Sequence, residues 1–402
     1  MRTAVPLLAV LLLASPAAAQ LPDHPISNAT GTLTAGAEVS GTFSRRDDTA
    51  FFNYTDYDNN ALRMARLRLM TEWRPHAQFS LVGELRVGSS THAEVAALFA
   101  RWRPVARWRL DIQAGRIPPV IGAFARRAYG RDNPLVGVPL AYQYLTSLRP
   151  DALPAIADDI LRMRARGWRP SFPIGSDATA PGLALVSAFH WDTGLAAHWS
   201  NDRVDLAAAI TRGAPARPVT KETNTGLQWS GRAAVMFPAG VTLGVSGARG
   251  DWIDQTALDL RPVASGVSVA QTVVGADASI ERGHWIVRAE YLHSTFGIPV
   301  ANDPTFTTPL TADTGFAEAR YRFLSRFQVA ARVERLTFSN IKGTLFGGTP
   351  TPWDAPVKRV EGTAAFRLTR TIEVRGGYQY NWREAGRVRK LGFPTLQLLY
   401  WF

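Results

Sequence analysis

Arginine and glutamate recur at every second position in several stretches of this sequence, so charged and apolar side chains alternate. Arg66, Arg68 and Glu72 share one parity in the first such stretch. Leu67 and Leu69 hold the other parity. Successive side chains of a β-strand point to opposite faces, which would place these charges together on one face. A wall of fixed charges acts on ions by attraction and repulsion, without a covalent step. Electrostatic selection is therefore the chemistry that these residues suggest.

The same parity argument selects a larger set of candidate pore-lining residues. They are Arg66, Arg68, Arg86, Arg109, Arg232, Arg288, Arg320, Arg322, Arg332, Arg375, Glu84, Glu318 and Glu334, with further members Arg367, Glu72, Asp111, Glu281, Glu290, Glu361 and Glu373. The net charge is +12, and only Lys221, Lys342, Lys358 and Lys390 of the 45 basic residues are lysine. The slight arginine excess predicts a mild preference for anions. Alternatively, arginines and acids of adjacent strands pair with one another and order water.

Alternating segments follow one another from about residue 61 to the end of the chain. The clearest examples are 61–74, 77–88, 358–369 and 371–381. In lipid every backbone donor and acceptor needs a partner within the protein, so a sheet can span a bilayer only if it closes on itself. The sequence predicts an all-β fold, a transmembrane antiparallel β-barrel of about 16 strands, which is wide enough for an aqueous channel. A soluble β-sandwich would also alternate, but it would not explain the connections.

Short and long connections alternate along the chain, which is typical of an outer-membrane barrel with periplasmic turns and external loops. Tight turns are predicted at 74–77, 103–107, 200–203, 237–240, 281–284, 323–326 and 368–371. Long connections are predicted at about 45–60, 88–93, 119–190, 213–225, 253–269, 296–312, 339–357 and 382–391.

The first 20 residues have the composition of a secretory signal peptide. Arg2 precedes the apolar run VPLLAVLLLASP, which is too short to span a bilayer, and AAAQ at 17–20 offers small residues for cleavage. The alternative is a buried first strand or helix. The sequence thus predicts a signal peptide at 1–20, a single barrel domain at 21–402, and export through the periplasm to the bacterial cell outer membrane.

The chain ends in TLQLLYWF, which places Leu398, Tyr400 and Phe402 on one face of a last strand. We expect this strand to close the barrel against a first strand near 35–44, with Phe402 buried at the periplasmic rim. A terminal Phe after alternating apolar residues resembles the end signal that the barrel-assembly machinery reads in outer-membrane proteins. The resemblance implies that machinery as a partner.

The longest connection, 119–190, would be the third external loop, and a loop of this length is usually functional. Its candidate constriction residues are Arg126, Arg127, Arg162, Arg164, Arg166, Asp158 and Asp159. The stretch 150–168 predicts a helix, with Asp151 as its cap, acids early and arginines late. In general porins the third loop folds into the barrel, so resemblance implies an inward-folding constriction loop. The alternative is an external cap that binds lipopolysaccharide phosphates or a neighbouring subunit.

Two segments resemble the phosphate-selective porin O and P superfamily. WRLDIQAGRIPPVIGAF at 108–124 is similar to the strand and Gly/Pro turn of that family, and DTGLAAHWSNDRVDLAAAITRG at 192–213 is similar to its next hairpin. The resemblance implies a 16-stranded, trimeric channel. Phosphate channels of this family rely on many lysines, and this chain has four.

Other chemistries find little support in the sequence. It contains no cysteine, which excludes thiolate metal sites and cysteine nucleophiles. Its seven histidines are scattered, so we expect no catalytic residue, no metal site and no cofactor. Export argues against a nucleic-acid partner. The expected partners are outer-membrane lipid, lipopolysaccharide and small hydrophilic anions, in a homotrimer. A surface adhesin and an outer-membrane barrel enzyme remain the alternatives to a porin.

Overall fold

The computed structural model describes residues 26–28, 30–55, 59–88, 93–128, 130–220, 224, 226–260 and 267–402. The predicted signal peptide, 1–20, lies outside these residues. Within these described residues the main sheet has 17 strands, of which sixteen form a closed antiparallel barrel, and β1 (Ile26–Asn28) pairs with the start of β2. None of the helices in the described ranges is long and apolar enough to cross a membrane.

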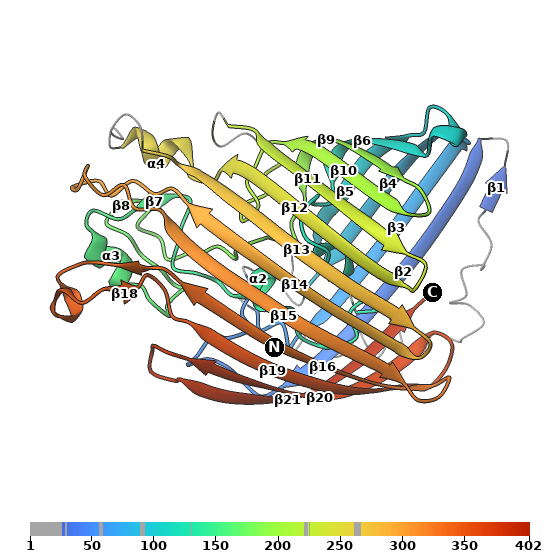
Figure 1. The fold of residues 1–402 in the computed structure, drawn as a ribbon. Coiled ribbons are helices and arrows are strands. Elements are labelled where there is room, and N and C mark those ends of the chain that lie inside the picture. The colour runs from blue at the N-terminus through green and yellow to red at the C-terminus, as the bar shows by residue number, and fades with distance from the viewer. Residues whose placement is uncertain are drawn as a thin grey trace.

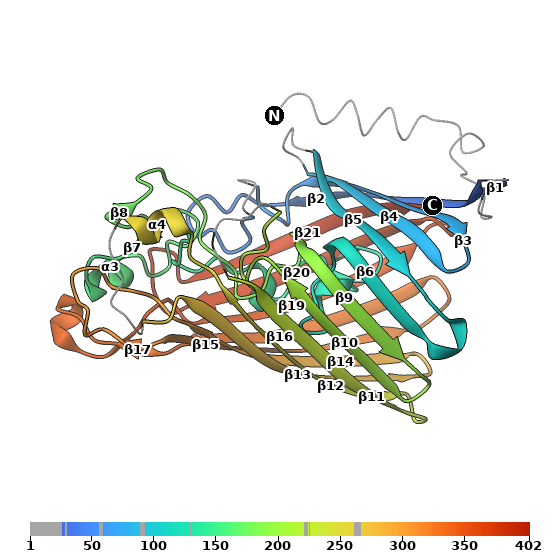
Figure 2. The same cartoon turned by 90° about the horizontal axis from the view of Figure 1, so that it is seen from above.

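The barrel strands follow one another around the wall in chain order (Figures 1 and 2). They are β2 (Gly31–Ser44), β3 (Ala65–His76), β4 (Phe79–Val87), β5 (Ala93–Trp102), β6 (Leu110–Ile117), β9 (Asp192–Ser200), β10 (Val204–Thr211), β11 (Gln228–Phe237), β12 (Val241–Asp251), β13 (Ala270–Arg282), β14 (Trp285–Phe296), β15 (Leu310–Arg322), β16 (Phe327–Phe338), β19 (Val357–Arg367), β20 (Ile372–Arg383) and β21 (Lys390–Trp401). The last strand pairs with the first, from Glu38 opposite Trp401 to Ser44 opposite Thr395. The predicted closed barrel of about 16 strands is confirmed.

The predicted alternation of connections is also confirmed. All seven predicted tight turns join neighbouring barrel strands, and the eight predicted long connections lie at the other end of the strands. In Figure 1 the long connections gather at the left and the short turns at the right. The third long connection joins β6 to β9 and carries β7 (Ala152–Leu153), β8 (Ile174–Gly175), α2 (Leu140–Gln143) and α3 (Ala157–Arg162).

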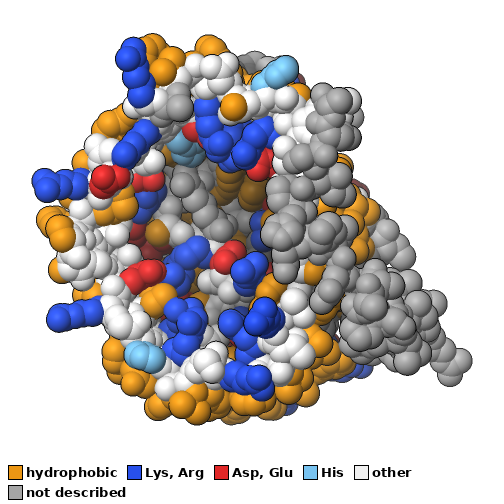
Figure 3. All heavy atoms as spheres, turned by 90° about the vertical axis from the view of Figure 1, so that its right-hand side faces the viewer, with side chains coloured by type: hydrophobic (Ala, Val, Ile, Leu, Met, Phe, Trp, Pro, Cys, Tyr) orange, Lys and Arg blue, Asp and Glu red, His pale blue; other side chains and the backbone are white. Residues whose placement is uncertain are grey.

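The two faces of the sheet have opposite chemistry. On β16 the outward Val333 is 53% exposed, whereas its neighbours Arg332 and Glu334 are buried. Seen from the end with the short turns, apolar side chains form the outer surface and charged side chains gather around a hollow centre (Figure 3). Outer apolar side chains suit contact with hydrocarbon, and inner charges suit contact with water.

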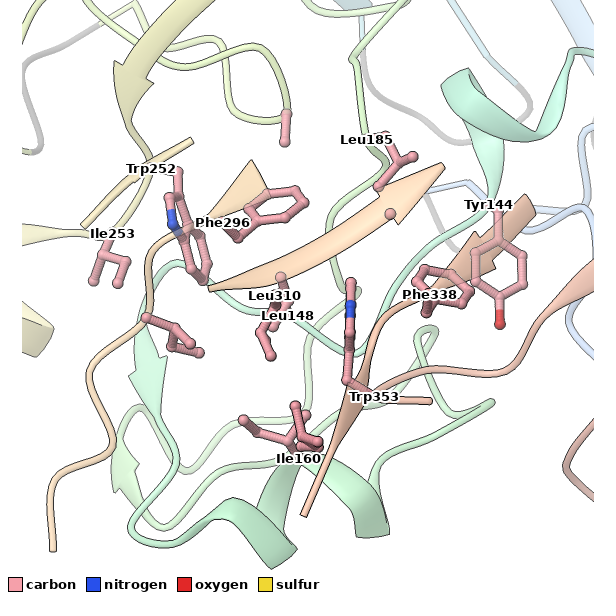
Figure 4. Packing of buried hydrophobic residues seen from close by; sticks show 14 of the residues in the cluster. Tyr144, Leu148, Ile160, Leu185, Trp252, Ile253, Phe296, Leu310, Phe338 and Trp353 are labelled. Atoms are coloured by element: carbon pink, nitrogen blue, oxygen red, sulfur yellow. The ribbon is translucent and has the colours of Figure 1, made fainter. Parts of the chain in front are cut away.

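The long connections pack against one another through a hydrophobic cluster (Figure 4). Trp252, which follows β12, lies edge-on to Phe296 at the end of β14, with ring centroids 5.5 Å apart. Trp353 contacts Phe338 in the same way at 4.7 Å. Ile160 of α3 belongs to the cluster as well. This packing joins the third connection to the barrel rim.

Two sequence predictions about local structure are wrong. The helix predicted over 150–168 is only α3, because Asp151 forms a bidentate ion pair with Arg149 instead of a cap. Ala165 then takes a φ of 61° and donates its N–H to Asp354 at 2.9 Å, which ends any helix there. Phe402 was expected to be buried, yet the residue is 38% exposed, although its backbone pairs with Ala37.

Candidate functional site

A fully buried arginine on the inner face of the barrel contacts three carboxylates. Arg332 of β16 lies 2.9 Å from Glu334 on its own strand, 3.1 Å from Glu361 on β19 and 3.3 Å from Glu318 on β15. One cation cannot balance three anions, so the carboxylates need further donors. Several of these donors come from residues 120–143 of the third connection, which we call the anchored segment.

Backbone groups of the anchored segment bind directly to this cluster. The N–H of Gly137 donates to Glu361 at 2.6 Å, and the N–H of Leu140 donates to Glu334 at 2.6 Å. Arg332 in turn donates to the carbonyl oxygen of Gly137 at 2.9 Å. Such charge-assisted hydrogen bonds are about twice as strong as neutral ones. The carboxylates around Arg332 therefore hold this part of the segment through its backbone.

Glu290 of β14 holds the beginning of the anchored segment. One of its carboxylate oxygens accepts the N–H groups of Ala123 at 2.6 Å and Phe124 at 3.0 Å. The other oxygen accepts the hydroxyl of Tyr142. Burial, reinforced by the charge of Glu290, raises the pKa of Tyr142 well above its usual value, so this tyrosine remains a donor.

The middle of the anchored segment is held by the two strands that flank β21, the last strand of the barrel. Glu38 of β2 accepts the N–H groups of Gly130 and Arg131, both at 3.0 Å. Arg375 of β20 donates to the carbonyl oxygen of Asn133 at 2.7 Å. The anchored segment thus contacts inward side chains of β2, β14, β16, β19 and β20.

Most of the predicted wall arginines lie on inner faces and pair with acids. The pairs are Arg68 with Glu84 at 3.0 Å, Arg86 with Glu84 at 2.5 Å, Arg232 with Asp277 at 2.7 Å, Arg288 with Glu281 at 3.2 Å and Arg375 with Glu373 at 2.7 Å. The guanidinium of Arg66 lies over the ring of Phe189, 5.3 Å from its centroid. The pairs of Arg68 and Arg288 join adjacent strands, as the alternative of mutual neutralisation expects. The pairs of Arg86 and Arg375 lie along one strand, and Arg232 of β11 reaches across β12 to β13.

Three predicted wall residues differ from the rest. Arg320 and Arg322 lie at successive inward positions of β15, and in the described part of the chain neither has a carboxylate within ion-pair distance. Arg109 is not on a strand. It precedes β6 with a φ of 53° and pairs with Asp202 at 2.7 Å, at the end with the short turns.

The predicted constriction residues fall into two separate groups. Arg127 belongs to the anchored segment, where it lies 3.4 Å from Glu318 and over the ring of Phe124. Burial lowers the pKa of Arg127, and the nearby Arg288 adds to this effect. The side chain of Arg126 lies outside the described part of the structure. Of the six candidates whose side chains are described, Arg127 is the one that contacts the charged inner face of the barrel.

The other predicted constriction residues lie in α3 or directly after it, among the long connections. Asp159 accepts the N–H groups of Ala155 and Ile156 at 2.9 and 3.1 Å and pairs with Arg162 at 3.1 Å. Asp158 accepts the N–H of Leu345 at 3.1 Å. Arg164 lies over the ring of Phe346, and the N–H of Arg166 donates to the carbonyl oxygen of Met163 at 2.9 Å. These contacts stabilise the loops.

Two residues that hold the anchored segment were absent from the sequence-based candidates. Glu38 alternates with Ser40 and Thr42, a polar parity that could have identified it. Arg359 donates to the carbonyl oxygens of Val138 and Phe52, both at 3.0 Å. The parity of its strand places Arg359 on the polar face, but its binding to two loops carries no sequence signal.

One arrangement of side chains resembles a catalytic set. On the outer face, His293 lies 2.8 Å from Asp313 and 3.3 Å from the hydroxyl of Thr295. The surrounding backbone N–H groups are used in the pairing of β13, β14 and β15, which leaves no pair of donors for a developing oxyanion. Among the described residues, no group of three or more His, Cys, Asp or Glu side chains could hold a metal ion.

No protein-family model matches this chain, and no curated protein matches it. Its structure is similar to OmpF of Salmonella typhi in complex with daunomycin, with a TM-score of 0.56 and 12% identity over 94% of this chain and 100% of that one. It is also similar to the outer-membrane protein OmpT of Vibrio cholerae, with a TM-score of 0.55 and 8% identity over 94% and 100% of the two chains. The chain shares the fold of these barrels.

A further similar structure is the outer-membrane channel DcaP of Acinetobacter baumannii. The TM-score is 0.51 and the identity 8%, over 94% of this chain and 99% of that one. At such low identity the likeness concerns the fold, so activity must be argued from this chain's own residues.

Proposed function

We propose that this chain is a porin of the bacterial outer membrane, a passive diffusion channel for small hydrophilic solutes. The proposal rests on a closed barrel whose inner face carries charges and whose outer face carries exposed apolar side chains. A barrel of this strand number is wide enough for an aqueous channel. The DcaP structure of the same fold is described as an outer-membrane channel, which supports this reading.

The observation that carries the proposal is the attachment of the anchored segment. Glu38, Glu290, Glu334 and Glu361 project inward from β2, β14, β16 and β19, which lie within one arc of seven neighbouring strands, and each binds backbone N–H groups of residues 120–143. These contacts support the proposal that the segment lies along this part of the inner wall. In this proposal it forms the constriction, with Arg127 as one charged side chain that faces the wall.

A mild anion preference is part of the proposal. Most wall arginines are neutralised by acids, but Arg320 and Arg322 lie on β15 without such a partner among the described residues. Unpaired arginine side chains on a lumen wall attract anions. The resemblance to the phosphate-selective porin O and P superfamily suggests phosphate as the specific anion. Arginine would then attract phosphate in place of lysine.

The first test is single-channel conductance in planar bilayers, with the reversal potential measured across a salt gradient. We expect steady large steps and a reversal potential on the anion side. The double variant Arg320→Glu with Arg322→Glu should move the reversal potential toward cations. The matched control is Arg326→Glu with Arg370→Glu, which makes the same charge change at exposed positions in short turns.

Titration with inorganic phosphate decides between a general and a phosphate-specific channel. Block of chloride current by phosphate would support specificity, and unaltered current would limit the proposal to a general porin. Folded protein without any conductance would contradict the porin proposal and favour the adhesin or the barrel enzyme.

The proposal extends to the route and the assembly of the protein. Residues 1–20 would be removed as a signal peptide during export, and the barrel-assembly machinery would recognise the end of β21, with Leu398, Tyr400 and Phe402 on its outer face. We propose a homotrimer, as one of the OmpT structures is described as a trimer form. Mass measurement of the folded protein in detergent should give three times the mass of one chain, and a single-chain mass would contradict the trimer.

A further inference from the structure

A row of six side-chain positions crosses the outer face of the barrel near the long connections. Residues directly opposite one another on neighbouring strands define it. The row is Tyr291 on β14, Gly315 on β15, Arg335 on β16, Lys358 on β19, Trp382 on β20 and Lys390 on β21. These strands lie side by side in Figure 1. We call this set the outer row.

Three of the six positions carry exposed positive charges. Arg335, Lys358 and Lys390 are exposed, whereas the inward neighbours Glu334 and Arg359 are buried. Within the described part of the chain, no carboxylate lies within ion-pair distance of any of these three cations. The outer row thus differs from the inner wall, where most arginines have acidic partners.

The placement of these cations is unfavourable within the chain itself. Arg335 lies directly opposite Lys358, and like charges at such positions destabilise a sheet. On a lipid-facing surface an arginine or lysine costs roughly 2–4 kcal/mol at the bilayer midplane and about 0–1 kcal/mol near the interface. An unfavourable arrangement of charges that no other contact within the molecule offsets points to a function.

The position of the cations along the strands indicates the lipid interface. Lys358 is the second residue of β19 and Lys390 is the first of β21, so both directly follow long connections. Arg335 lies near the end of β16 that leads into the next long connection. Trp382 and Tyr291, in the same row, are the aromatic types that favour a membrane interface. The row therefore lies at the rim of the apolar surface.

The surroundings of the row fit an amphiphilic ligand. All six residues line one groove, and the outward Val333 and Val360 line it too. Val333 and Val360 are 53% and 44% exposed and lie on the midplane side of Arg335 and Lys358. Gly315 adds no side chain of its own between Tyr291 and Arg335. Cations beside an apolar floor suit an anionic headgroup that carries acyl chains.

We infer that Arg335, Lys358 and Lys390 bind the phosphate groups of an outer-leaflet lipid, with lipopolysaccharide as the occupant. A guanidinium binds phosphate oxygens in a bidentate manner, and ammonium groups add positive charge. The bound phosphates would remove the repulsion between Arg335 and Lys358. This inference rests on the proposed outer-membrane location, but not on conduction by the lumen.

The test compares the lipid A moiety of lipopolysaccharide in its phosphorylated and dephosphorylated forms. The full barrel is folded in neutral detergent, and its midpoint of thermal unfolding is followed while either form is added. Phosphorylated lipid A should raise the midpoint, and the dephosphorylated form should not. The triple variant Arg335→Ala, Lys358→Ala, Lys390→Ala should lose at least tenfold in affinity for phosphorylated lipid A.

The matched control removes three positive charges from the other end of the barrel. Arg107, Arg326 and Arg370 are exposed in short connections, and their replacement by alanine should leave lipid A binding unchanged. If the triple variant fails to fold, the conservative pair Arg335→Lys with Lys358→Arg, which should bind, is compared with the single variant Lys358→Gln, which should bind more weakly.

Three outcomes would overturn the inference. The first is that the wild type and the triple outer-row variant bind lipid A with equal affinity. The second is that dephosphorylated lipid A raises the midpoint as much as the phosphorylated form does. The third is that millimolar inorganic phosphate alone raises the midpoint as much as lipid A does. Conductance of the same samples separates this result from the porin proposal. Channels without lipid A binding would refute only the outer-row site, whereas lipid A binding without channels would refute only the porin.

Discussion

At the scale of single residues, Arg332 is a fully buried cation surrounded by Glu318, Glu334 and Glu361. We predict that Arg332→Met lowers the free energy of unfolding by about 3–5 kcal/mol, the range typical when one member of a buried ion pair is removed. The three carboxylates would repel one another without it. Equilibrium unfolding in denaturant measures the loss.

The control for this prediction is Arg326→Met, at an exposed position in the turn between β15 and β16. It removes the same charge without leaving buried carboxylates, so its effect should stay within about 0.5 kcal/mol. Equal losses in the two variants would show that net charge matters and that the buried cluster does not.

A second residue-scale prediction concerns Asp47, in the connection between β2 and β3. Its carboxylate accepts the N–H of Phe52 at 2.7 Å, but burial outweighs this contact and raises the pKa of Asp47 to about 6. A raised pKa means that the folded state holds the proton more tightly than the unfolded state does. Asp47 therefore contributes stability that is fully present below about pH 4 and lost as the pH rises through about 6.

The variant Asp47→Asn should remove this pH dependence. The midpoint of thermal unfolding, measured between pH 4 and 7, should fall less steeply with rising pH in the variant than in the wild type. Asp48→Asn is the matched control, because Asp48 is exposed and its ion pair with Arg46 is on the surface. Parallel profiles for the wild type and Asp47→Asn would contradict the prediction.

At the scale of elements, the anchored segment depends on close approach of its backbone to the wall. A Cβ atom on Gly137 would lie 2.4 Å from a carboxylate oxygen of Glu361 and 2.6 Å from the side-chain nitrogen of Gln379. We predict that Gly137→Val displaces the segment from the wall and raises single-channel conductance. The control is Gly376→Val, because a Cβ atom there would meet nothing within 4 Å.

Unchanged conductance in Gly137→Val, with the barrel folded, would show that the segment does not narrow the channel. A decrease would mean that displacement moves the segment further across the lumen. Gly376→Val is the control for both results, because it adds the same atoms on the outer face of β20.

The elements of the barrel were predictable because strand parity and turn length act locally. Arg86 and Glu84 share a parity and a face, as predicted, and the turn at 323–326 lies where its sequence indicates. The third connection was not predictable in the same way. Its shape depends on contacts between distant positions, such as Gly137 with Glu361 and Ala165 with Asp354, and no local pattern encodes those.

The candidate site was also predictable only in part. The sequence could place Arg332, Glu318 and Glu334 on one face, but it could not show that the three meet at a single point on neighbouring strands. It could not exclude Arg109 either, because the parity of β6 was extended one residue too far into the preceding turn. Register between strands decides which charges meet, and register follows from the closed barrel as a whole.

At the scale of the whole molecule, closure is the property on which the fold depends. β21 covers the edges of both β20 and β2, and every backbone group of a membrane-spanning sheet needs such a partner. We predict that removal of residues 395–402 abolishes the folded barrel, because two edges would be left open within lipid. Resistance to unfolding in sodium dodecyl sulfate, followed by electrophoresis, measures the folded fraction after refolding.

The matched control removes residues 26–28, which pair with the start of β2 but take no part in closing the barrel. Both deletions remove strand residues, yet only one opens the ring. We therefore expect the control to refold to the wild-type level and the 395–402 deletion to give no resistant form. A folded barrel without residues 395–402 would mean that β20 can pair with β2 directly, and the wall would then close with fifteen strands instead of sixteen.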